Sequence, residues 1–473
     1  MAENDSRFAA VRIIYDKTPL KWLLNTSTFI GNVVIALIIT YFFQPGELPS
    51  ESKFVPFLLI LSVGLWITEA IPPFAVDIFI IAYMVFVFGT DYFFTSQYPI
   101  DRYVGTWTSS VIWLLLGGFF LAEGMKVVKL DVYLFRFTIK HFGASSQGLL
   151  KGFMLITGFA SMVMSNTATT TMMIASIVPL VKTLGKDKAL SKALLVGIPA
   201  AAFIGGIVTI IGSTPNAIAV GALEGIGIKV SFLKWMAFGF PLALLLIWLL
   251  WKFLIYKLKL SNEKIDTTFI QKEMADVNMT QRKIVVFTTL FTVLLWITEP
   301  IHKIPLAGTS AFPIVVLTLT RVISSTDVRA LPWDTLMLVA GGLSLGLALV
   351  DFKLTTTFMD MLLGNNLPLL VLLGLLVLFS VMFSNIMSNT AASSILIPLG
   401  LSLGGFYQVS APILIGICAS FALFLPVSTP PNAIAYATNL MEQKDFRLGG
   451  LFIGIVGLVI TIIWVLLLSM FLF

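Results

Sequence analysis

The sequence predicts an all-α polytopic membrane protein with 11 transmembrane helices and two re-entrant helical hairpins, in two repeats of inverted topology. Three observations support this fold class. The 473 residues are 58% hydrophobic and only 11% charged, with a mean hydropathy of +0.98, whereas soluble domains carry about 25% charged residues. Apolar runs of about 20 residues, each long enough to cross a bilayer as a helix, recur along the chain. Four distinctive motifs also occur in pairs, with one member in each half.

Hydropathy and turn signals place the crossings in order. The first follows a mixed-charge segment, exceeds 20 residues and has no small-residue cleavage site after it, so we expect a retained span and no signal peptide. The single cysteine, Cys418, excludes an internal disulfide. The crossings are expected near residues 22–43, 54–72, 74–94, 108–125, 193–222, 232–256, 284–299, 305–323, 333–350, 409–437 and 449–472.

Two further apolar stretches, 147–184 and 367–404, are too long for one crossing and too interrupted for two. Each carries a Ser-Asn-Thr triplet near its middle, with a helix-forming stretch on either side. This pattern predicts re-entrant hairpins, which enter and leave the membrane on the same side. Irregular backbone at that depth is tolerated only inside protein or beside a water-filled cavity.

Positive charge supports this arrangement and sets its orientation. With the N-terminus in the cytoplasm and the C-terminus outside, all but six of the 30 Lys and Arg fall on the cytoplasmic side or its boundary, as the positive-inside rule predicts. We therefore expect a multi-pass protein of the cytoplasmic (inner) membrane. The net charge of +6 belongs to the loops and implies no nucleic-acid partner. The six remaining cations are Lys53, Arg102, Lys229, Lys234, Lys303 and Lys353.

Paired motifs divide the chain into two inverted repeats. Five crossings separate each motif from its copy, 215 to 230 residues later, and an odd number inverts the topology. The expected units are residues 1–53 with the first span, a first repeat at 54–256, a cytoplasmic linker at 257–283 and a second repeat at 284–473. The pairs are LWITEAIPP with LWITEPIHK, LLLGGFFLAEG with MLVAGGLSLG, MSNTATTTMM with MSNTAASSIL, and GSTPNAIAVG with VSTPPNAIAYA.

The Ser-Asn-Thr and Thr-Pro motifs favour a small anion as ligand. Pro215 and the pair Pro430-Pro431 break their spans, so 193–222 and 409–437 are expected to be broken helices. Hairpin tips and helix breaks expose N-terminal amides, which carry partial positive charge and attract carboxylates, while the freed carbonyls suit Na⁺. Two equivalent triplets suit a ligand with two equivalent ends, such as a dicarboxylate. The motifs contain no Lys, Arg or His, which suits a neutral site in a moving carrier.

Other readings of these residues are weaker. A single Ser-Asn-Thr in a membrane helix is more often helix–helix glue than a ligand site, but four paired motifs reverse that preference. Glu69 and Glu299 lie at span ends, where capping or structural pairing is favoured over proton relay, while Asp77 and Glu123 remain weak proton-site candidates. An intramembrane enzyme would need a nucleophile–base pair or a carboxylate dyad, and neither HExxH nor GxGD occurs. No sequence feature favours a channel.

The sequence also predicts the structure of two further segments. The polar stretch 257–283 is expected to be a solvated linker. Segment 126–142 is expected to form an amphipathic helix in the cytoplasmic interface, with Val, Leu, Phe and Ile opposite a polar stripe. That stripe consists of Lys126, Lys129, Tyr133, Arg136 and Lys140.

These motifs, in this order and spacing, resemble those of the divalent anion/sodium symporter family, and the resemblance covers nearly the whole chain. It implies a homodimer in which a transport domain of hairpins and broken helices slides against a scaffold as an elevator. It also implies substrate contacts from Ser165, Asn166, Thr167, Ser213, Thr214, Ser388, Asn389, Thr390, Thr429 and Pro430. The implied first Na⁺ site uses Ser161, Ser165, Asn166 and Gly212, and the second uses Ser384, Met387, Asn389 and Ser428.

The second Na⁺ set departs from the family pattern, because Ser384 stands for Thr, Met387 for Ala and Ser428 for Ala. The family also contains sodium-independent exchangers. We therefore expect a carrier of small dicarboxylates such as succinate, malate, fumarate or 2-oxoglutarate, with a slight lean to exchange (antiport). Na⁺-coupled symport is the alternative, as is citrate, sulfate or another divalent anion as cargo. Apart from Na⁺ as coupling ion we expect no cofactor, and the lipid bilayer is the other partner.

Overall fold

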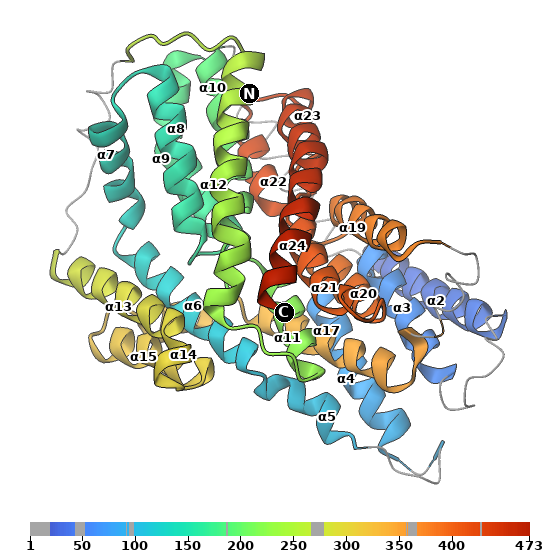
Figure 1. The fold of residues 1–473 in the computed structure, drawn as a ribbon. Helices are drawn as coiled ribbons and strands as arrows, with labels where there is room; N and C mark the ends of the chain where they lie inside the picture. The colour runs from blue at the N-terminus through green and yellow to red at the C-terminus, as the bar shows by residue number, and fades with distance from the viewer. Residues whose placement is uncertain are drawn as a thin grey trace.

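The computed structural model describes residues 19–42, 53–90, 92–93, 99–185, 188–265, 279–355, 357, 367–425 and 428–473. Within these ranges the regular secondary structure is helical, apart from one isolated bridge between Ser145 and Lys264. Figure 1 shows the helices in chain order. Most of the N-terminal segment and the middle of the linker, 266–278, lie outside the described residues.

The first half of the chain begins with helices that match apolar runs in the sequence. Its elements are α2 (Pro19–Phe42), α3 (Phe54–Thr68), α4 (Pro73–Phe88), α5 (Asp101–Val104), the 3-10 turn η2 (Gly105–Thr108), α6 (Ser110–Val127), α7 (Leu130–Phe142), α8 (Ser146–Ser161), α9 (Asn166–Leu184), α10 (Ala189–Gly206), α11 (Thr214–Gly225) and α12 (Phe232–Lys257).

The second half repeats this order. Its elements are α13 (Met279–Ile297), α14 (Glu299–His302), α15 (Leu306–Leu319), α16 (Ser325–Arg329), α17 (Trp333–Asp351), α19 (Leu369–Ile386), α20 (Asn389–Leu401), α21 (Tyr407–Ala419), α22 (Pro430–Ala437), α23 (Gln443–Phe452), the π-helical turn η4 (Ile453–Gly457) and α24 (Leu458–Leu472).

The described part of the chain contains nine helices that are long and apolar enough to cross a membrane, and five shorter apolar helices. This establishes an all-helical, multi-pass membrane protein. The number of complete crossings and the side on which each hairpin opens depend on the position of the bilayer, and they stay predictions.

Helix pairs occupy the two stretches for which hairpins are expected. In 147–184, α8 ends at Ser161 and α9 begins at Asn166, and the two helices pack against each other. In 367–404, α19 ends at Ile386 and α20 begins at Asn389, again with direct packing. The stretches 193–222 and 409–437 each contain two helices separated by irregular backbone, α10 with α11 and α21 with α22.

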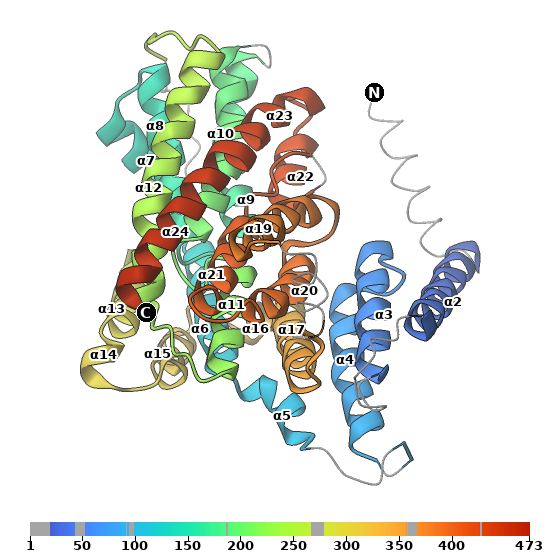
Figure 2. The ribbon, with the colours of Figure 1, turned by 45° about the vertical axis from the view of Figure 1, so that its right-hand side comes forward.

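Packing interleaves the two halves. Helix α9 of the first half packs on α22 of the second, and α11 of the first half packs on α20 and α21 of the second. A different group of contacts joins α4 to α17 and α6 to α15, while α2 packs mainly on α3. In Figure 2, α2 to α4 lie on the opposite side of the molecule from α7, α8 and α12.

The paired Gly-Gly motifs mark two equivalent close helix crossings. On α17, Gly341 lies against α4, where a Cβ on Gly341 would come within 2.5 Å of the Cα of Asp77. On α6, Gly117 lies against α15, where a Cβ would come within 2.8 Å of the backbone oxygen of Ser310. Because glycine has no Cβ, it permits this approach, so the repetition of the Gly-Gly motif in both halves reflects helix packing within this chain.

The tryptophans of the Trp-Ile-Thr-Glu motifs are buried beside these crossings. Trp66 donates its indole N–H to the carboxylate of Asp77 at 3.2 Å, and Trp296 donates to the hydroxyl of Ser310 at 3.1 Å. Trp66 and Trp296 are both buried, so they pack between helices. Asp77 therefore occupies the same structural position as a neutral serine in the other half.

The expectation of one continuous amphipathic helix over 126–142 is wrong. Helix α6 continues to Val127, and Lys129 then adopts a left-handed conformation, with φ of 47°, before α7 begins at Leu130. Lys126 belongs to α6, where it forms an ion pair with Glu123 at 2.9 Å. The polar stripe is thus divided between two helices. The ion pair with Lys126 gives Glu123 a structural role.

The first part of the linker is packed, contrary to the expectation of a solvated segment. The backbone N–H of Ser146 donates to the carbonyl of Glu263 at 2.9 Å, and the N–H of Ile265 donates to the carbonyl of Ala144 at 2.8 Å. These bonds attach residues 263–265 to the start of α8, so the linker contributes to the position of the first helix pair.

Candidate functional site

The two Ser-Asn-Thr motifs and the two Thr-Pro motifs, four in all, each begin a helix. Ser165, Ser213, Ser388 and Thr429 are the N-cap residues of α9, α11, α20 and α22. Their backbones agree in pairs, with φ/ψ of −63°/148° and −65°/147° at the two Ser-Asn-Thr triplets, and −147°/136° and −147°/150° at the two breaks. Four helix N-termini therefore present partial positive charge without a cationic side chain in any motif.

The serines of the two triplets cap their helices. The Oγ of Ser165 accepts a hydrogen bond from the N–H of Ala168 at 3.2 Å, and the Oγ of Ser388 accepts from the N–H of Ala391 at 3.1 Å. Capping uses a lone pair of each hydroxyl and leaves its proton available to donate. Each serine therefore fixes the start of its helix and retains a donor for an anion.

The remaining predicted substrate residues lie at the same helix starts. Thr167 and Thr390 are the second residues of α9 and α20, and both are half-buried. Thr214 is the first residue of α11 and is half-buried, while Pro430 is the first residue of α22 and is exposed.

Three of the four residues of the first Na⁺ set meet at one point. The hydroxyl of Ser161 lies 2.8 Å from the side-chain amide of Asn166, and the carbonyls of Gly212 and Ala202 lie 3.2 Å and 3.0 Å from that amide. With its nitrogen turned toward these groups, Asn166 donates to both carbonyls. With its oxygen turned toward them, four neutral oxygens face one another, which is the ligand type that hard cations require.

Close backbone packing supports this oxygen cluster. A Cβ on Gly212 would lie 2.5 Å from the backbone oxygen of Gly206 and 3.0 Å from that of Ser161. At Gly206, a Cβ would collide with the amide of Asn166. Because any side chain at these two glycines would displace the cluster, the break between α10 and α11 is shaped to place backbone carbonyls beside Asn166.

The second Na⁺ set has a different geometry. Among the described residues, the hydroxyl of Ser384 and the amide oxygen of Asn389 are buried without a hydrogen-bond partner. The hydroxyl of Ser428 donates to the carbonyls of Ala422 and Leu425, at 3.1 and 2.8 Å. Met387 is buried beside the start of α20. Two buried oxygens without partners are costly unless a ligand or water satisfies them, so this second set keeps unused binding capacity.

The two helix breaks meet directly. The hydroxyl of Ser213 lies 3.0 Å from that of Ser420, which follows the last residue of α21. Thr429 occupies the position equivalent to Ser213, and in the described part of the chain its buried hydroxyl makes no hydrogen bond. The broken helices of the two repeats are thus joined at their irregular segments.

Sequence reasoning missed the residues that hold the breaks in shape. Asn216 donates its amide to the carbonyls of Gly206 and Thr209, at 2.9 and 2.8 Å, and Asn432 donates to the carbonyl of Leu425 at 3.0 Å. The Pro-Asn pair in both Thr-Pro motifs was the sequence signal that could have identified these two asparagines. The partner serine, Ser420, has no counterpart in the motifs, so no sequence signal identified it.

The ligands available for a cation are neutral. Across the described ranges no three His, Cys, Asp or Glu side chains gather in a way that could hold a metal ion. A cation at the Asn166 cluster would therefore bind to amide, hydroxyl and carbonyl oxygens. This chemistry suits Na⁺, which unwound carbonyls and half-helix ends coordinate in transporters.

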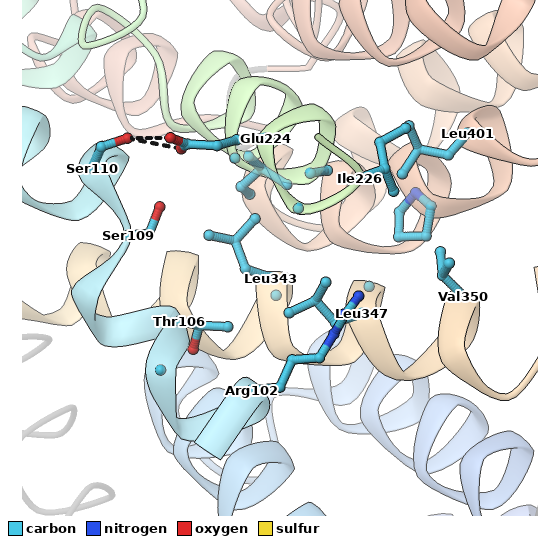
Figure 3. Close-up of a pocket in the computed structure, with 18 of the residues that line it drawn as sticks. Arg102, Thr106, Ser109, Ser110, Glu224, Ile226, Leu343, Leu347, Val350 and Leu401 are labelled. Carbon is cyan, nitrogen blue, oxygen red and sulfur yellow. Dashed lines mark hydrogen bonds between the residues drawn. The ribbon is translucent and has the colours of Figure 1, made fainter. Parts of the chain in front are cut away.

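A separate cavity of about 410 Å³ lies near the ends of α11 and α20, against η2 and α17. None of the described residues that line it is a predicted substrate or Na⁺ residue, although Ile218 and Gly221 belong to the GSTPNAIAVG motif. At its edge the hydroxyl of Ser110 donates to the carboxylate of Glu224, with distances of 2.7 and 3.0 Å to its two oxygens (Figure 3). Arg102 forms an ion pair with Asp351 at 3.1 Å beside the same cavity.

Multiple apolar spans, interrupted helices and motif-bearing helix starts define a membrane transporter. A family model described as the sodium:sulfate symporter transmembrane region matches residues 24–473. The chain belongs to this family, which confirms the sequence prediction of a transporter rather than an enzyme.

Curated relatives extend this assignment. The chain is 29% identical to the sodium-dependent dicarboxylate transporter SdcS of Staphylococcus saprophyticus over 460 residues, covering 89% of this chain and 87% of the relative. It is 27% identical to SdcS of Staphylococcus aureus over 490 residues, covering 95% and 92% of the two chains. These names support the resemblance noted from the motifs.

Two solved structures share the fold. MtrF of Neisseria gonorrhoeae, an antimetabolite efflux pump, aligns with a TM-score of 0.55 at 13% identity, over 84% of this chain and 94% of that one. The YdaH transporter of Alcanivorax borkumensis aligns with a TM-score of 0.50 at 15% identity, over 87% and 98%. At these identities the similarity concerns the fold alone.

Proposed function

We propose that this protein is a Na⁺-coupled carrier of small dicarboxylates, of the succinate, malate, fumarate and 2-oxoglutarate class. The observation that carries the proposal is the position of Asn166. It is the first residue of α9, at a helix start suited to a carboxylate, and its amide also lies within the oxygen cluster suited to Na⁺. One side chain therefore belongs to both candidate sites.

The oxygen and the nitrogen of the Asn166 amide provide a physical route by which cation binding is coupled to substrate binding. Without a cation, the amide nitrogen is favoured toward the carbonyls of Ala202 and Gly212, because oxygen would face only acceptors there. A cation in the cluster reverses that preference, since its charge attracts the amide oxygen. The nitrogen then points away from the carbonyls and becomes available to donate to a substrate carboxylate. Na⁺ binding thus prepares the anion site.

The slight lean to exchange finds no support in the curated relatives, which are named sodium-dependent. The lean rested on the changed residues Ser384, Met387 and Ser428. The first Na⁺ set keeps its residues, and the unpartnered oxygens of Ser384 and Asn389 leave the second set able to bind. We therefore take Na⁺-coupled symport, the alternative in the sequence prediction, as the proposed mode.

The proposed transport cycle is an elevator. Two hairpins and two broken helices, α8 to α11 and α19 to α22, would move together against the remaining scaffold. The contacts that support one moving unit are those of α9 with α22, of α11 with α20, and between Ser213 and Ser420. We further propose a homodimer in the cytoplasmic membrane, with the N-terminus inside and the C-terminus outside, and the domain bounds expected from the sequence.

Uptake into proteoliposomes tests the substrate class. The purified full-length chain, with an inward Na⁺ gradient, is expected to take up radiolabelled succinate saturably. Excess unlabelled malate or fumarate should suppress the signal, because both carry two carboxylates at similar spacing, whereas monocarboxylic butyrate should not. Suppression by sulfate or citrate alone, with no effect of malate, would contradict the proposed substrate class and favour the other cargo.

A further inference from the structure

An apolar cavity of about 360 Å³ lies between α2, α3, α17 and α20, and none of the predicted substrate or Na⁺ residues lines it. Its wall includes Ile39 of α2, Val63 of α3, Leu349 of α17 and Ile395 of α20. At about 30 Å³ per water-sized group, this volume holds roughly a dozen such groups. A cavity with so few polar partners is a poor site for water, so its expected occupant is apolar.

The cavity borders the lipid phase. One of its walls is α2, whose other apolar side chains are largely exposed, including Ile35 at 54% and Ile38 at 51%. Because an exposed apolar helix of a membrane protein faces lipid, acyl chains lie directly beside this cavity. Figure 2 shows α2 and α3 at the edge of the molecule, next to α17 and α20.

The dimensions of the cavity match one leaflet. Its wall follows α3 from Pro56 to Val63, and Lys53 is the N-cap of that helix. At 1.5 Å per residue, Lys53 and Val63 are separated by about 15 Å along the helix, which is half of a hydrocarbon core of about 30 Å. With Lys53 at the outer end of the predicted crossing, the cavity runs from about one helical turn below the membrane surface to about the bilayer midplane.

Two cations stand at the surface end of the cavity. Lys53 lies about one turn before Pro56, and Lys353 immediately precedes Leu354, another residue of the wall. Both lysines are exposed, and both belong to the six cations expected outside the cytoplasm. Lysines at a membrane surface attract anionic lipid headgroups.

We propose that this cavity is a binding site for an anionic phospholipid. One acyl chain fills the space between α2, α3, α17 and α20, and the phosphate lies near Lys53 and Lys353. The predicted orientation places the lipid in the outer leaflet. Because α20 belongs to the second hairpin and α3 does not, the bound lipid touches both the proposed moving unit and the scaffold.

Thermal unfolding of the purified full-length chain in detergent tests the proposal. Added phosphatidylglycerol is expected to raise the unfolding midpoint more than phosphatidylcholine with the same acyl chains. In the double variant Lys53→Gln/Lys353→Gln, the difference between the two lipids should disappear, while Lys229→Gln/Lys303→Gln keeps it. The control pair removes two other cations expected on the same side.

A second variant separates the acyl-chain pocket from the headgroup site. Val63→Trp fills the inner end of the cavity and should abolish the response to either lipid, whereas Leu290→Trp, on the exposed face of α13, should keep both responses. Equal responses in the natural protein, Val63→Trp and the lysine double variant would overturn the proposal, because they would show a general effect of lipid on the detergent-solubilised protein.

Discussion

Asn166→Ala and Asn389→Ala are each expected to reduce the kcat/KM of Na⁺-driven succinate uptake by about 10- to 100-fold. Both residues begin a hairpin helix, α9 or α20, and both are proposed to donate to the substrate. A hydrogen bond to a charged group contributes about 1.5–3 kcal/mol, which corresponds to this range. Initial uptake rates in proteoliposomes, at matched protein content and varied succinate, measure the change.

The Na⁺ dependence of the Asn166 variant tests the second role of this residue. Asn166→Ala also removes the amide oxygen from the Ser161–Gly212 cluster, so its half-saturating Na⁺ concentration should rise. Thr171→Ala, on the exposed side of the same helix, is the matched control and should transport normally. Normal uptake by both asparagine variants would show that the assigned site is wrong.

Chemical cross-linking of positions 110 and 224 is expected to stop transport completely and reversibly. Ser110 lies on α6, which belongs to the proposed scaffold, and Glu224 lies on α11, which belongs to the proposed moving unit. Their hydrogen bond of 2.7 Å spans the boundary between the two (Figure 3). In Ser110→Cys/Glu224→Cys, a short bis-methanethiosulfonate cross-linker, which joins the two thiols through disulfides, should prevent sliding, and reduction should restore uptake.

The chain offers favourable conditions for this experiment. Its only natural cysteine, Cys418, is buried, which limits background reaction. Arg102→Cys/Asp351→Cys is the control, because Arg102 lines the same cavity, its ion pair with Asp351 is 3.1 Å long, and both residues lie outside the hairpins and broken helices. Its cross-linked form should still transport. Full transport by the cross-linked 110/224 variant would contradict an elevator that moves α11 against α6.

Much of the fold was predictable because membrane helices have strong local signals. Apolar length located the spans, and prolines located the breaks before α11 and α22. Periodicity failed at Lys129, because the charged stripe continues in sequence across a left-handed residue that separates two helices. Nothing in the spacing of Lys126 to Lys140 marks that change in direction.

The candidate site was predictable only at the level of its motifs. Repetition of Ser-Asn-Thr identified Ser165 and Ser388, but their capping bonds and the second role of Asn166 depend on neighbours that are distant in sequence. The contact between Ser213 and Ser420 joins the two repeats, so a motif within one repeat carries no information about it. The changes at Ser384, Met387 and Ser428 suggested exchange, but side-chain identity alone does not show that two oxygens of this set remain without partners.

The most direct test of Na⁺-coupled dicarboxylate transport is succinate uptake into proteoliposomes under four conditions. An inward Na⁺ gradient is present or absent, and unlabelled succinate is present or absent inside. Uptake should require the Na⁺ gradient and proceed without internal succinate, because the oxygen cluster at Asn166 couples the cation to the anion site. Uptake that requires internal succinate and ignores Na⁺ would contradict the account and establish an exchanger.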